Sequence, residues 1–252
     1  MKKDALSALE LERYTRHLSL PNFGKAGQLR LKQASALVVG VGGLGSVSSL
    51  YLSLAGLGTI GLMEDDLVSR DNLHRQILYT TNDLGESKLT RAAETLKHHN
   101  PEVNFITYPH RLTAENALAI ISNYDLVIDG TDNVQARQVI NQACVTLDKP
   151  YIYGAVNLFD GQVSVFHASQ GPCWWCLYPH RTASGPEKTA AQLAVLNTLP
   201  AVVAALQATE VIKLIVGMGK PLIGQVLLYN ALNAAFERIE IAKDPHCPVC
   251  GN

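Results

Sequence analysis

Three segments in the first half of the chain carry residue types that suit a nucleotide. The first, Gly40–Gly45, is rich in glycine, so its backbone can approach a phosphate or a ribose without Cβ atoms in the way. The second, Glu64–Asp66, offers carboxylates that can accept hydrogen bonds from ribose hydroxyls. The third, Asn72–Gln76, adds amide and guanidinium donors for phosphate oxygens. The first two segments would also serve a dinucleotide, but the third indicates a triphosphate and predicts that ATP is consumed.

Two further charged residues extend this candidate site. Lys88 begins a predicted helix and can reach a phosphate as a point charge. Asp132 follows a buried strand, at the sheet edge where ligands of open α/β sheets bind, and a carboxylate there can coordinate Mg²⁺ through phosphate. The residues predicted from type and position to bind the nucleotide and its metal are Gly42, Gly43, Glu64, Asp66, Asn72, Arg75, Gln76, Lys88 and Asp132.

Four of the five cysteines form two Cys-x-x-Cys pairs, Cys173 with Cys176 and Cys247 with Cys250. Four thiolates at this spacing suit a tetrahedral structural Zn²⁺ that would close the C-terminus onto the body of the protein. The alternatives are a redox dithiol or a disulfide. A redox pair normally occurs singly at a helix start, and a disulfide needs an oxidising compartment. The fifth cysteine, Cys144, lies on an apolar helix and is expected in the core.

These residues need a scaffold of alternating strands and helices to bring them together. Alternation of this kind gives a parallel sheet with helices on both faces. The predicted fold is therefore α/β, a Rossmann-like, mostly parallel sheet flanked by helices, with a C-terminal portion of β-strands and a zinc knuckle. Strands are predicted at Ala36–Gly40, Ile60–Met63, Val103–Tyr108, Asp125–Asp129, Tyr151–Tyr153, Gln162–Phe166 and Gln225–Tyr229. Helices are predicted at Leu9–Leu20, Ser46–Ala55, Lys88–His99 and Leu199–Val216.

Length and composition fit a single domain of 252 residues with a sizeable core, since 47% of the residues are hydrophobic. Within it we expect an N-terminal helical arm (1–30), a nucleotide-binding half (31–150) and a carrier-binding and zinc half (151–252). A net charge of −1 does not indicate a nucleic-acid partner. No signal peptide is recognised, and polar residues interrupt the apolar stretch Leu193–Tyr229, so we expect a cytoplasmic protein with no membrane span. The stretch Pro179–Ala190 is the best candidate for a mobile loop.

Taken in order and spacing, the motifs resemble those of the ThiF/MoeB/HesA family, the prokaryotic branch of the ubiquitin-activating superfamily. The resemblance covers nearly the whole chain, and the MoeB-type sulfur-carrier adenylyltransferases are the most similar in motif. The motifs that carry it are Gly40-x-Gly-Gly-Leu-Gly45, Asn72-Leu-x-Arg-Gln76, Gly85-x-x-Lys88, Thr131-Asp-Asn133, Arg13-Tyr-x-Arg16, Pro21-x-x-Gly24-x-x-Gly27-Gln28, Gly154-Ala155 before Gly161-Gln162, and the C-terminal Cys-x-x-Cys.

The resemblance implies that the C-terminal glycine carboxylate of a small ubiquitin-like carrier protein attacks the α-phosphate of ATP, giving an acyl-adenylate and pyrophosphate. Gly43 would contact the nucleotide, and Asn133 would neighbour it. Arg16 would reach into the partner subunit's site of a homodimer. The implied catalytic residues are Arg16, Arg75, Lys88 and Asp132, and the implied cofactors are ATP, Mg²⁺ and Zn²⁺.

The sequence departs from the family in two places. Glu64 stands where the family usually has aspartate, and a longer side chain can still accept from a ribose hydroxyl. Many relatives carry a loop cysteine near the position of Thr189 to Ala191, where this chain has none. A covalent carrier–enzyme step is therefore not expected, and the reaction is predicted to stop at the adenylate.

Three other functions stay open from the sequence. The acceptor can be a peptide C-terminus or a side-chain carboxylate in a secondary-metabolite pathway. A NAD-dependent oxidoreductase would explain the glycine segment and Glu64 but would leave Asn72, Arg75, Lys88 and the two cysteine pairs unused. A non-catalytic scaffold would be indicated by loss of Arg75, Lys88 or Asp132, and all three are present.

Overall fold

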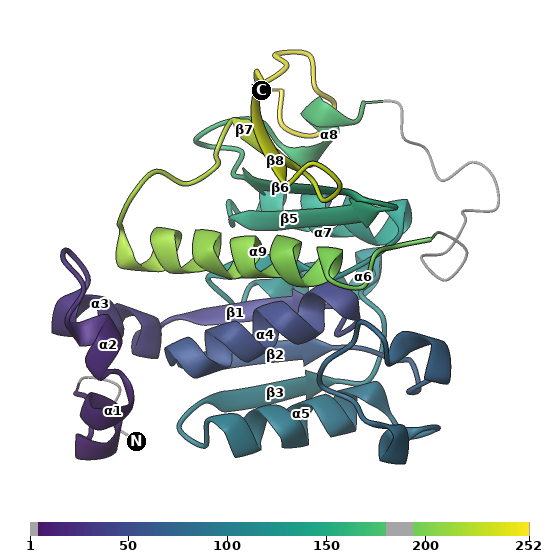
Figure 1. The fold of residues 1–252 in the computed structure, drawn as a ribbon. Coiled ribbons are helices and arrows are strands. Elements are labelled where there is room, and N and C mark those ends of the chain that lie inside the picture. The colour runs from purple at the N-terminus through teal and green to yellow at the C-terminus, as the bar shows by residue number, and fades with distance from the viewer. Residues whose placement is uncertain (1–4, 180–193, 252) are drawn as a thin grey trace.

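A single eight-stranded sheet organises the chain in the computed structural model, which describes residues 5–179 and 194–251 (Figure 1). The strand order is β3-β2-β1-β4-β5-β6-β7-β8. The strands are β1 (Ser35–Val39), β2 (Thr59–Met63), β3 (Asn104–Tyr108), β4 (Leu126–Asp129), β5 (Tyr151–Asn157), β6 (Asp160–Phe166), β7 (Gln225–Asn230) and β8 (Ala235–Glu240). The helices are α1 (Ala8–Arg13), α2 (Thr15–Leu18), α3 (Gly24–Gln33), α4 (Gly43–Ala55), α5 (Lys88–His99), α6 (Ala114–Ile121), α7 (Val134–Thr146), α8 (Trp174–Leu177) and α9 (Leu199–Val216), with 3₁₀ turns η1 (Arg70–Asn72) and η2 (Thr81–Asp83).

The sheet is parallel in its first half and antiparallel in its second. Strands β3, β2, β1, β4 and β5 pair in parallel, and β5 through β8 pair antiparallel. The parallel strands place their carboxyl ends at one edge, where the loops after β1, β2 and β4 meet (Figure 1). The predicted Rossmann-like fold is confirmed, and it puts the nucleotide-binding segments at this edge.

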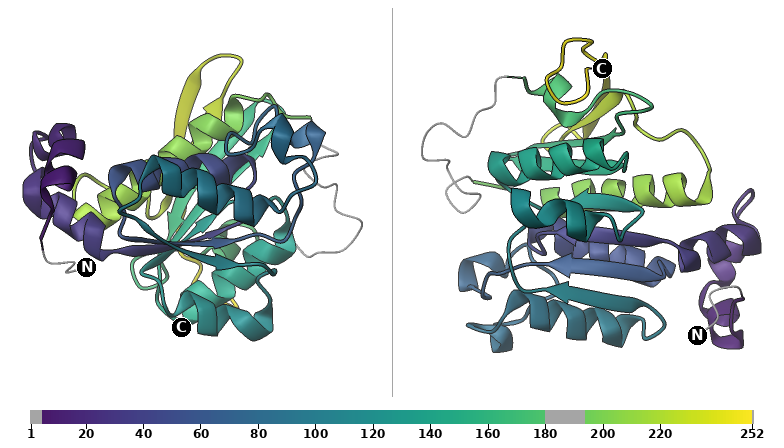
Figure 2. Two further views of the ribbon diagram at one scale, coloured as in Figure 1. Left: turned by 90° about the horizontal axis from the view of Figure 1, so that it is seen from below. Right: turned by 180° about the vertical axis from the view of Figure 1, so that it is seen from behind.

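Each face of the sheet is covered by its own helices. In β1, Ala36 and Val38 face the core that contains α4, α5 and α9, whereas Leu37 and Val39 face the core that contains α6 and α7. The views from below and from behind in Figure 2 show these two helical layers on opposite sides of the sheet. This burial on both faces explains why the parallel strands read as continuous apolar runs.

Helix α9 spans the range predicted from the sequence, Leu199–Val216. Among the described residues it is the one helix whose length and apolar composition would allow it to cross a membrane, and half of it is buried inside the protein. It packs against α4, α3 and strands β5 and β6, which accounts for its apolar residues. Gly217, with φ of 72°, ends it in the left-handed conformation that glycine favours.

The predictions about the elements were wrong or incomplete in several places: α3, α6 and α8 were not predicted, and α4 begins three residues before its predicted start at Ser46. The predicted continuous helix Leu9–Leu20 is two helices, α1 and α2, because the chain leaves helical geometry at Tyr14 to bury that ring. The Tyr14 hydroxyl accepts a hydrogen bond from Asn100 Nδ2 at 2.9 Å, which anchors the arm to the body. Strand β8 was not predicted, since all six of its residues are exposed and no apolar run marks it. Apart from Pro179, the predicted mobile loop Pro179–Ala190 lies outside the described residues.

Candidate active site and cysteine cluster

The glycine segment turns the chain sharply from β1 into α4. Gly40 has a φ of +83°, and a Cβ on Gly130, after β4, would lie 2.1 Å from its carbonyl oxygen. A Cβ on Gly45 would lie 1.9 Å from the same oxygen. Only glycine fits at these contacts, so the loops after β1 and β4 touch and α4 begins directly above the sheet edge. No side chain caps α4, which leaves its first backbone N–H groups to an anion.

Glu64 joins the glycine segment to the acidic turn that follows β2. Its Oε2 accepts from the Val41 N–H at 2.9 Å, and its Oε1 accepts from the Asp65 and Asp66 N–H groups at 3.0 and 3.1 Å. A carboxylate has about four lone-pair positions, so one is left for a ribose hydroxyl. The longer glutamate side chain therefore has a structural use here, because it spans the two loops.

The two predicted cations lie at this edge of the sheet. Arg75 Cγ is 3.6 Å from the position that a Cβ on Gly43 would take, which places the arginine against the start of α4. Lys88 opens α5 with a side chain that is only 6% exposed, and its Nζ pairs with Asp66 Oδ2 at 3.1 Å. The Lys88 backbone N–H also donates to the Asp66 carbonyl at 3.1 Å. Asp66 therefore holds the Lys88 side chain beside the acidic turn that follows β2.

Asn72, Arg75 and Gln76 belong to one tight turn, since the Asn72 carbonyl accepts from the N–H groups of both Arg75 and Gln76 at 3.1 Å. The Gln76 amide nitrogen lies 3.4 Å from the position of a Cβ on Gly42. Its Oε1 is buried and has no hydrogen-bond partner among the described residues. A buried acceptor without a partner is costly, so this atom fits a site in which a ligand supplies the missing donor.

Asp132 lies on the turn after β4, with an exposed side chain at the same edge as the glycine segment. Its neighbour Asn133 is the N-cap of α7, because its Oδ1 accepts from the Ala136 N–H at 2.8 Å. Asn133 therefore has a structural role as the N-cap of α7, which was not predicted from the sequence. That Asn133 neighbours the nucleotide, as the family resemblance implies, stays a prediction.

Arg16 lies elsewhere in the chain. It is exposed on α2, and Figure 1 shows α1 to α3 where β1 begins, at the end of the sheet opposite the glycine segment. The structure thus brings Arg75, Lys88 and Asp132 to one edge and leaves Arg16 apart from them.

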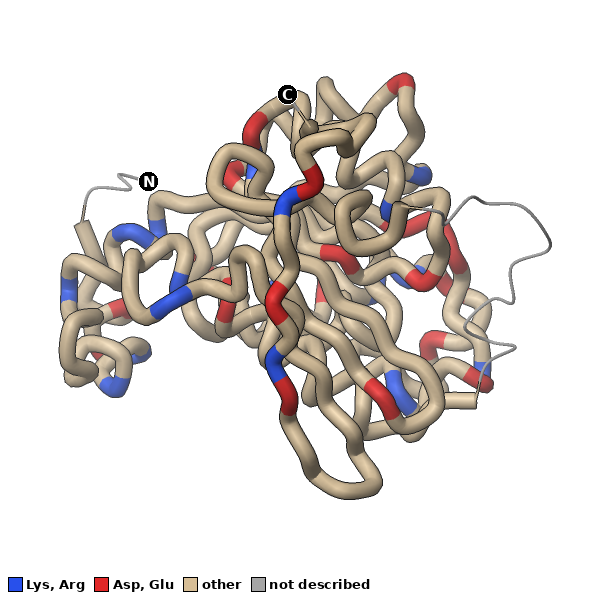
Figure 3. The backbone as a smooth tube through the Cα atoms, turned by 90° about the horizontal axis from the view of Figure 1, so that it is seen from above, with Lys and Arg blue, Asp and Glu red and all other residues tan. Residues whose placement is uncertain are grey.

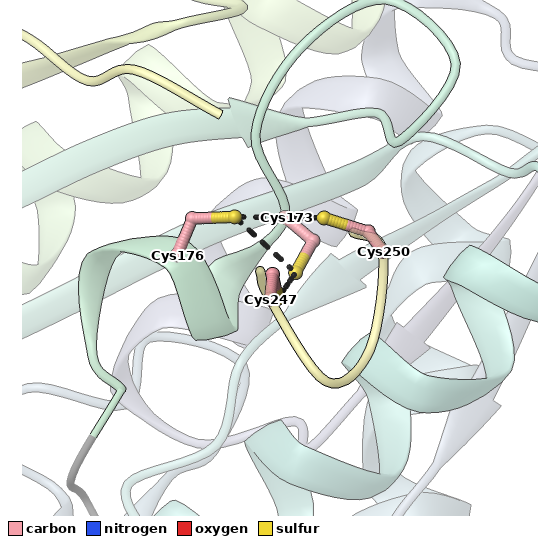
Figure 4. Close-up of side chains that lie close together, drawn as sticks. All are labelled: Cys173, Cys176, Cys247 and Cys250. Atoms are coloured by element: carbon pink, nitrogen blue, oxygen red, sulfur yellow. Dashed lines mark hydrogen bonds between the residues drawn. The ribbon is translucent and has the colours of Figure 1, made fainter. Parts of the chain in front are cut away.

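The four predicted metal ligands meet at the top of the molecule in Figure 1, where the C-terminus returns to α8 (Figure 4). Sulfur–sulfur separations are 3.5 Å for Cys176 and Cys250, 3.7 Å for Cys173 and Cys247, and 4.0 Å for Cys173 and Cys176. A tetrahedron of thiolates at a Zn–S distance of about 2.3 Å would have sulfurs about 3.8 Å apart, whereas a disulfide would need about 2.05 Å. The geometry therefore fits a metal better than a disulfide.

A metal ion bound at this cluster would have to displace thiol protons. Burial raises the pKa of the Cys173 thiol to about 11, so this group holds its proton at neutral pH unless a positive charge replaces it. Asn141 of α7 supports the site, with its Oδ1 accepting from the Trp174 N–H at 2.8 Å and its Nδ2 lying 3.7 Å from Cys173 Sγ. These side chains would hold Zn²⁺ with a closed four-sulfur shell, which is the arrangement of a structural site.

The residues behind the site were not predicted from the sequence. The hydroxyl of buried Tyr79 donates to the Val41 carbonyl at 2.7 Å and so fixes the glycine segment from below. A buried ion pair joins Asp129, at the end of β4, to Arg137 on α7, with Nε 3.1 Å from Oδ2. Charged residues inside an apolar strand and on the inner face of a helix were the available signal.

The sequence matches one protein-family model and several named proteins. The ThiF family model matches residues 14–249. A sulfur carrier protein adenylyltransferase of Thermus thermophilus is 48% identical over 248 residues, covering 96% of this chain and 92% of the relative. The probable adenylyltransferase/sulfurtransferase MoeZ of Mycobacterium tuberculosis is 42% identical, covering 97% of this chain and 63% of the relative. The adenylyltransferase and sulfurtransferase MOCS3-1 of Zea mays is 40% identical, and the chain spans 53% of its length.

Solved structures support the fold. A crystal structure of E. coli MccB with MccA-N7isoASN matches with a TM-score of 0.85 at 23% identity, over 100% of this chain and 77% of that one. At this identity the match shows the fold alone. Together with the family match over residues 14–249 and the relative at 48% identity, the findings confirm the resemblance drawn from the sequence: the chain belongs to the ThiF family and is an adenylyltransferase of the MoeB type.

Proposed function

We propose that this enzyme adenylylates the C-terminal glycine carboxylate of a small ubiquitin-like sulfur-carrier protein, with ATP as the donor and pyrophosphate as the second product. The observation that carries the proposal is the placement of two cations at one edge of the sheet: Arg75 lies against the start of α4, and Lys88 pairs with Asp66 in the turn after β2. Two cations near a glycine-rich helix start and an acidic turn suit the phosphates of a triphosphate. The relative from Thermus thermophilus, named for a sulfur carrier protein, supports the choice of acceptor.

The proposed step needs no general base. A carboxylate is already a nucleophile, so its oxygen forms the new bond to the α-phosphorus while the bond from that phosphorus to the pyrophosphate oxygen breaks. Arg75 and Lys88 would neutralise the charge that builds up on the phosphates, and Gln76 Oε1 would accept from the nucleotide. Asp132 would hold Mg²⁺, which adds positive charge at the phosphates. The residues present fit both groups, since the acidic and cationic side chains share one edge of the sheet.

The enzyme is expected to bind ATP with Mg²⁺ more tightly than NAD. A dinucleotide would use the glycine segment and Glu64 but would leave Arg75 and Lys88 without a phosphate to bind. Calorimetric titration with both ligands measures the difference. Tighter binding of NAD would overturn the proposed function, whereas pyrophosphate exchange with a panel of ubiquitin-like sulfur carriers would identify the acceptor.

We further propose that the enzyme works as a cytoplasmic homodimer with two composite sites. Arg16 lies at the opposite end of the sheet from Lys88, so it would act in the site of a second subunit. Lys and Arg gather on the N-terminal helices, while both signs of charge mingle over much of the rest of the molecule (Figure 3). A basic arm suits the approach to a site that holds a triphosphate. Four closely spaced thiols without a disulfide suit the reducing cytoplasm.

Mixing an Arg16→Ala chain with a Lys88→Ala chain should restore activity that neither variant has alone. In a mixed dimer one site would contain both intact residues, so random pairing would give about a quarter of the wild-type pyrophosphate exchange. A mixture of Lys88→Ala with Arg75→Ala is the matched control, because both residues serve the site of their own chain and no intact site forms. Equal recovery in both mixtures, or none in the first despite proven mixed dimers, would refute the role of Arg16.

A further inference from the structure

Beneath the turn that carries Asp132 lies a buried carboxylate whose four hydrogen bonds all serve that turn or its supports. Asp129 is 0% exposed. Its Oδ1 accepts from the backbone N–H and the hydroxyl of Thr131 at 2.8 and 2.6 Å. Its Oδ2 accepts from Arg137 Nε at 3.1 Å and from the Tyr151 hydroxyl at 2.8 Å. The carboxylate therefore fixes Thr131, the residue directly before Asp132.

Arg137 also binds this turn, through the carbonyl of Thr131. Its Nη2 donates to the Thr131 carbonyl at 2.9 Å and to the Gly154 carbonyl at 3.4 Å, and its guanidinium carbon lies 5.3 Å from the centre of the Tyr153 ring. Burial alone would lower the pKa of this guanidinium, but the Asp129 carboxylate outweighs burial and raises it. The side chain therefore stays charged and uses its planar fork on Asp129 and Thr131 together.

The residues on both sides of Asp132 are thus held in place. Thr131 is bound through its N–H, hydroxyl and carbonyl, and Asn133 caps α7, the helix that carries Arg137. A buried ion pair gives weak net stability, because desolvating two charges offsets much of their attraction. Such a pair is better explained by the geometry that it imposes, and here the residue whose geometry it imposes is exposed at the proposed metal position.

We propose that Arg137, fixed by Asp129 and Tyr151, is a positioning residue that aims the Asp132 carboxylate at the divalent cation bound with ATP. The inference rests on the proposed function, since it takes Asp132 to be the metal-binding carboxylate. Arg137 touches neither the nucleotide nor the carrier in this assignment. Its effect passes through the Thr131 carbonyl, in the way that outer partners orient metal-binding side chains.

Mn²⁺ titration tests the role directly, because free Mn²⁺ gives an electron paramagnetic resonance signal that bound Mn²⁺ loses. Full-length wild type, Asp132→Asn, Arg137→Lys and Tyr151→Phe are each titrated in the presence of ATP and without a carrier, and an enzyme-free titration of the same ATP is subtracted because ATP itself binds Mn²⁺. Tyr124→Phe is the matched control. It also removes a buried phenolic hydroxyl, one that lies 3.0 Å from the Tyr108 hydroxyl and away from the Asp132 turn.

Mn²⁺ affinity should fall about tenfold in Arg137→Lys, since a lysine can pair with Asp129 but cannot also hold the Thr131 carbonyl in a fork. Tyr151→Phe should shift it in the same direction by less, and Tyr124→Phe should not shift it. Raising Mg²⁺ should restore pyrophosphate exchange in Arg137→Lys, as expected of weakened metal binding and not of lost structure.

Failure of the proposed function and failure of the positioning role of Arg137 give different results in this experiment. If Asp132→Asn binds Mn²⁺ as tightly as wild type, the metal position of the proposed function is wrong and the role of Arg137 falls with it. If Asp132→Asn loses affinity while folded Arg137→Lys and Tyr151→Phe keep it, the proposed function stands and the positioning role of Arg137 is overturned. Tyr151→Phe keeps the ion pair, so it supplies this answer even if Arg137→Lys does not fold.

Discussion

Replacing Lys88 with alanine is expected to lower carrier-dependent pyrophosphate exchange about a hundredfold or more, through the loss of one preorganised charge at the phosphates. The lysine side chain is only 6% exposed, so its charge acts in a site from which most water is excluded. Its partner Asp66 is 57% exposed and would be solvated after the change, so the fold should persist. The measurement is isotope exchange between pyrophosphate and ATP, with circular dichroism to verify folding.

Lys97→Ala is the matched control for this change. Lys97 lies on the same helix, α5, and its ammonium donates to the Pro101 and Val103 carbonyls at 2.6 and 3.0 Å, away from the glycine segment. Arg75→Ala should lose exchange to a similar extent, with Arg91→Ala on α5 as its control. Exchange near the wild-type rate in both Lys88→Ala and Arg75→Ala would contradict the proposed phosphate site.

The parts of the fold that could be predicted are those in which burial dictates the residue types. The strands that are covered on both faces read as apolar runs, and α5 and α9 begin and end where the sequence analysis placed them. Strand β8 is held by backbone pairing to β7 while its side chains face solvent, so its composition carries no signal of burial. The break at Tyr14 depends on Asn100 and Gly56, which are distant in sequence, and helical periodicity alone cannot reveal it.

The candidate site likewise has residues that local sequence patterns predict and residues that only the fold brings together. Glycine spacing and the two Cys-x-x-Cys pairs are local patterns with a chemical requirement, and the structure brings each set together. The clamp of Asp129, Arg137 and Tyr151 combines a strand end, a helix and the next strand. Each member looks ordinary in its own segment, and only the parallel pairing of β4 with β5 makes them neighbours.

Removing metal from the cysteine cluster should lower the thermal unfolding temperature by roughly 10 °C, from about 4 kcal/mol of stabilisation at free Zn²⁺ a thousandfold above its Kd and about 2–4 °C per kcal/mol for a domain of this size. Binding at a closed four-thiolate site contributes directly to folding. Here it joins α8 to the C-terminal segment, which otherwise has few apolar contacts with the body. Calorimetry before and after chelation, with elemental analysis for one Zn²⁺ per chain, measures both effects.

Cys247→Ser should reproduce the loss of metal and of stability without a chelator, because three thiolates bind Zn²⁺ much more weakly than four. Cys144→Ser is the matched control, since Cys144 is also buried but lies on α7 outside the cluster. Its variant should keep one Zn²⁺ per chain whatever its own cost in stability. An unchanged unfolding temperature in metal-free wild type would contradict a structural metal, and a disulfide found by mass spectrometry between members of the cluster would indicate redox chemistry instead. The sulfur separations of 3.5 to 4.0 Å argue for the metal, because they match the edges of a tetrahedron around Zn²⁺ and exceed any S–S bond.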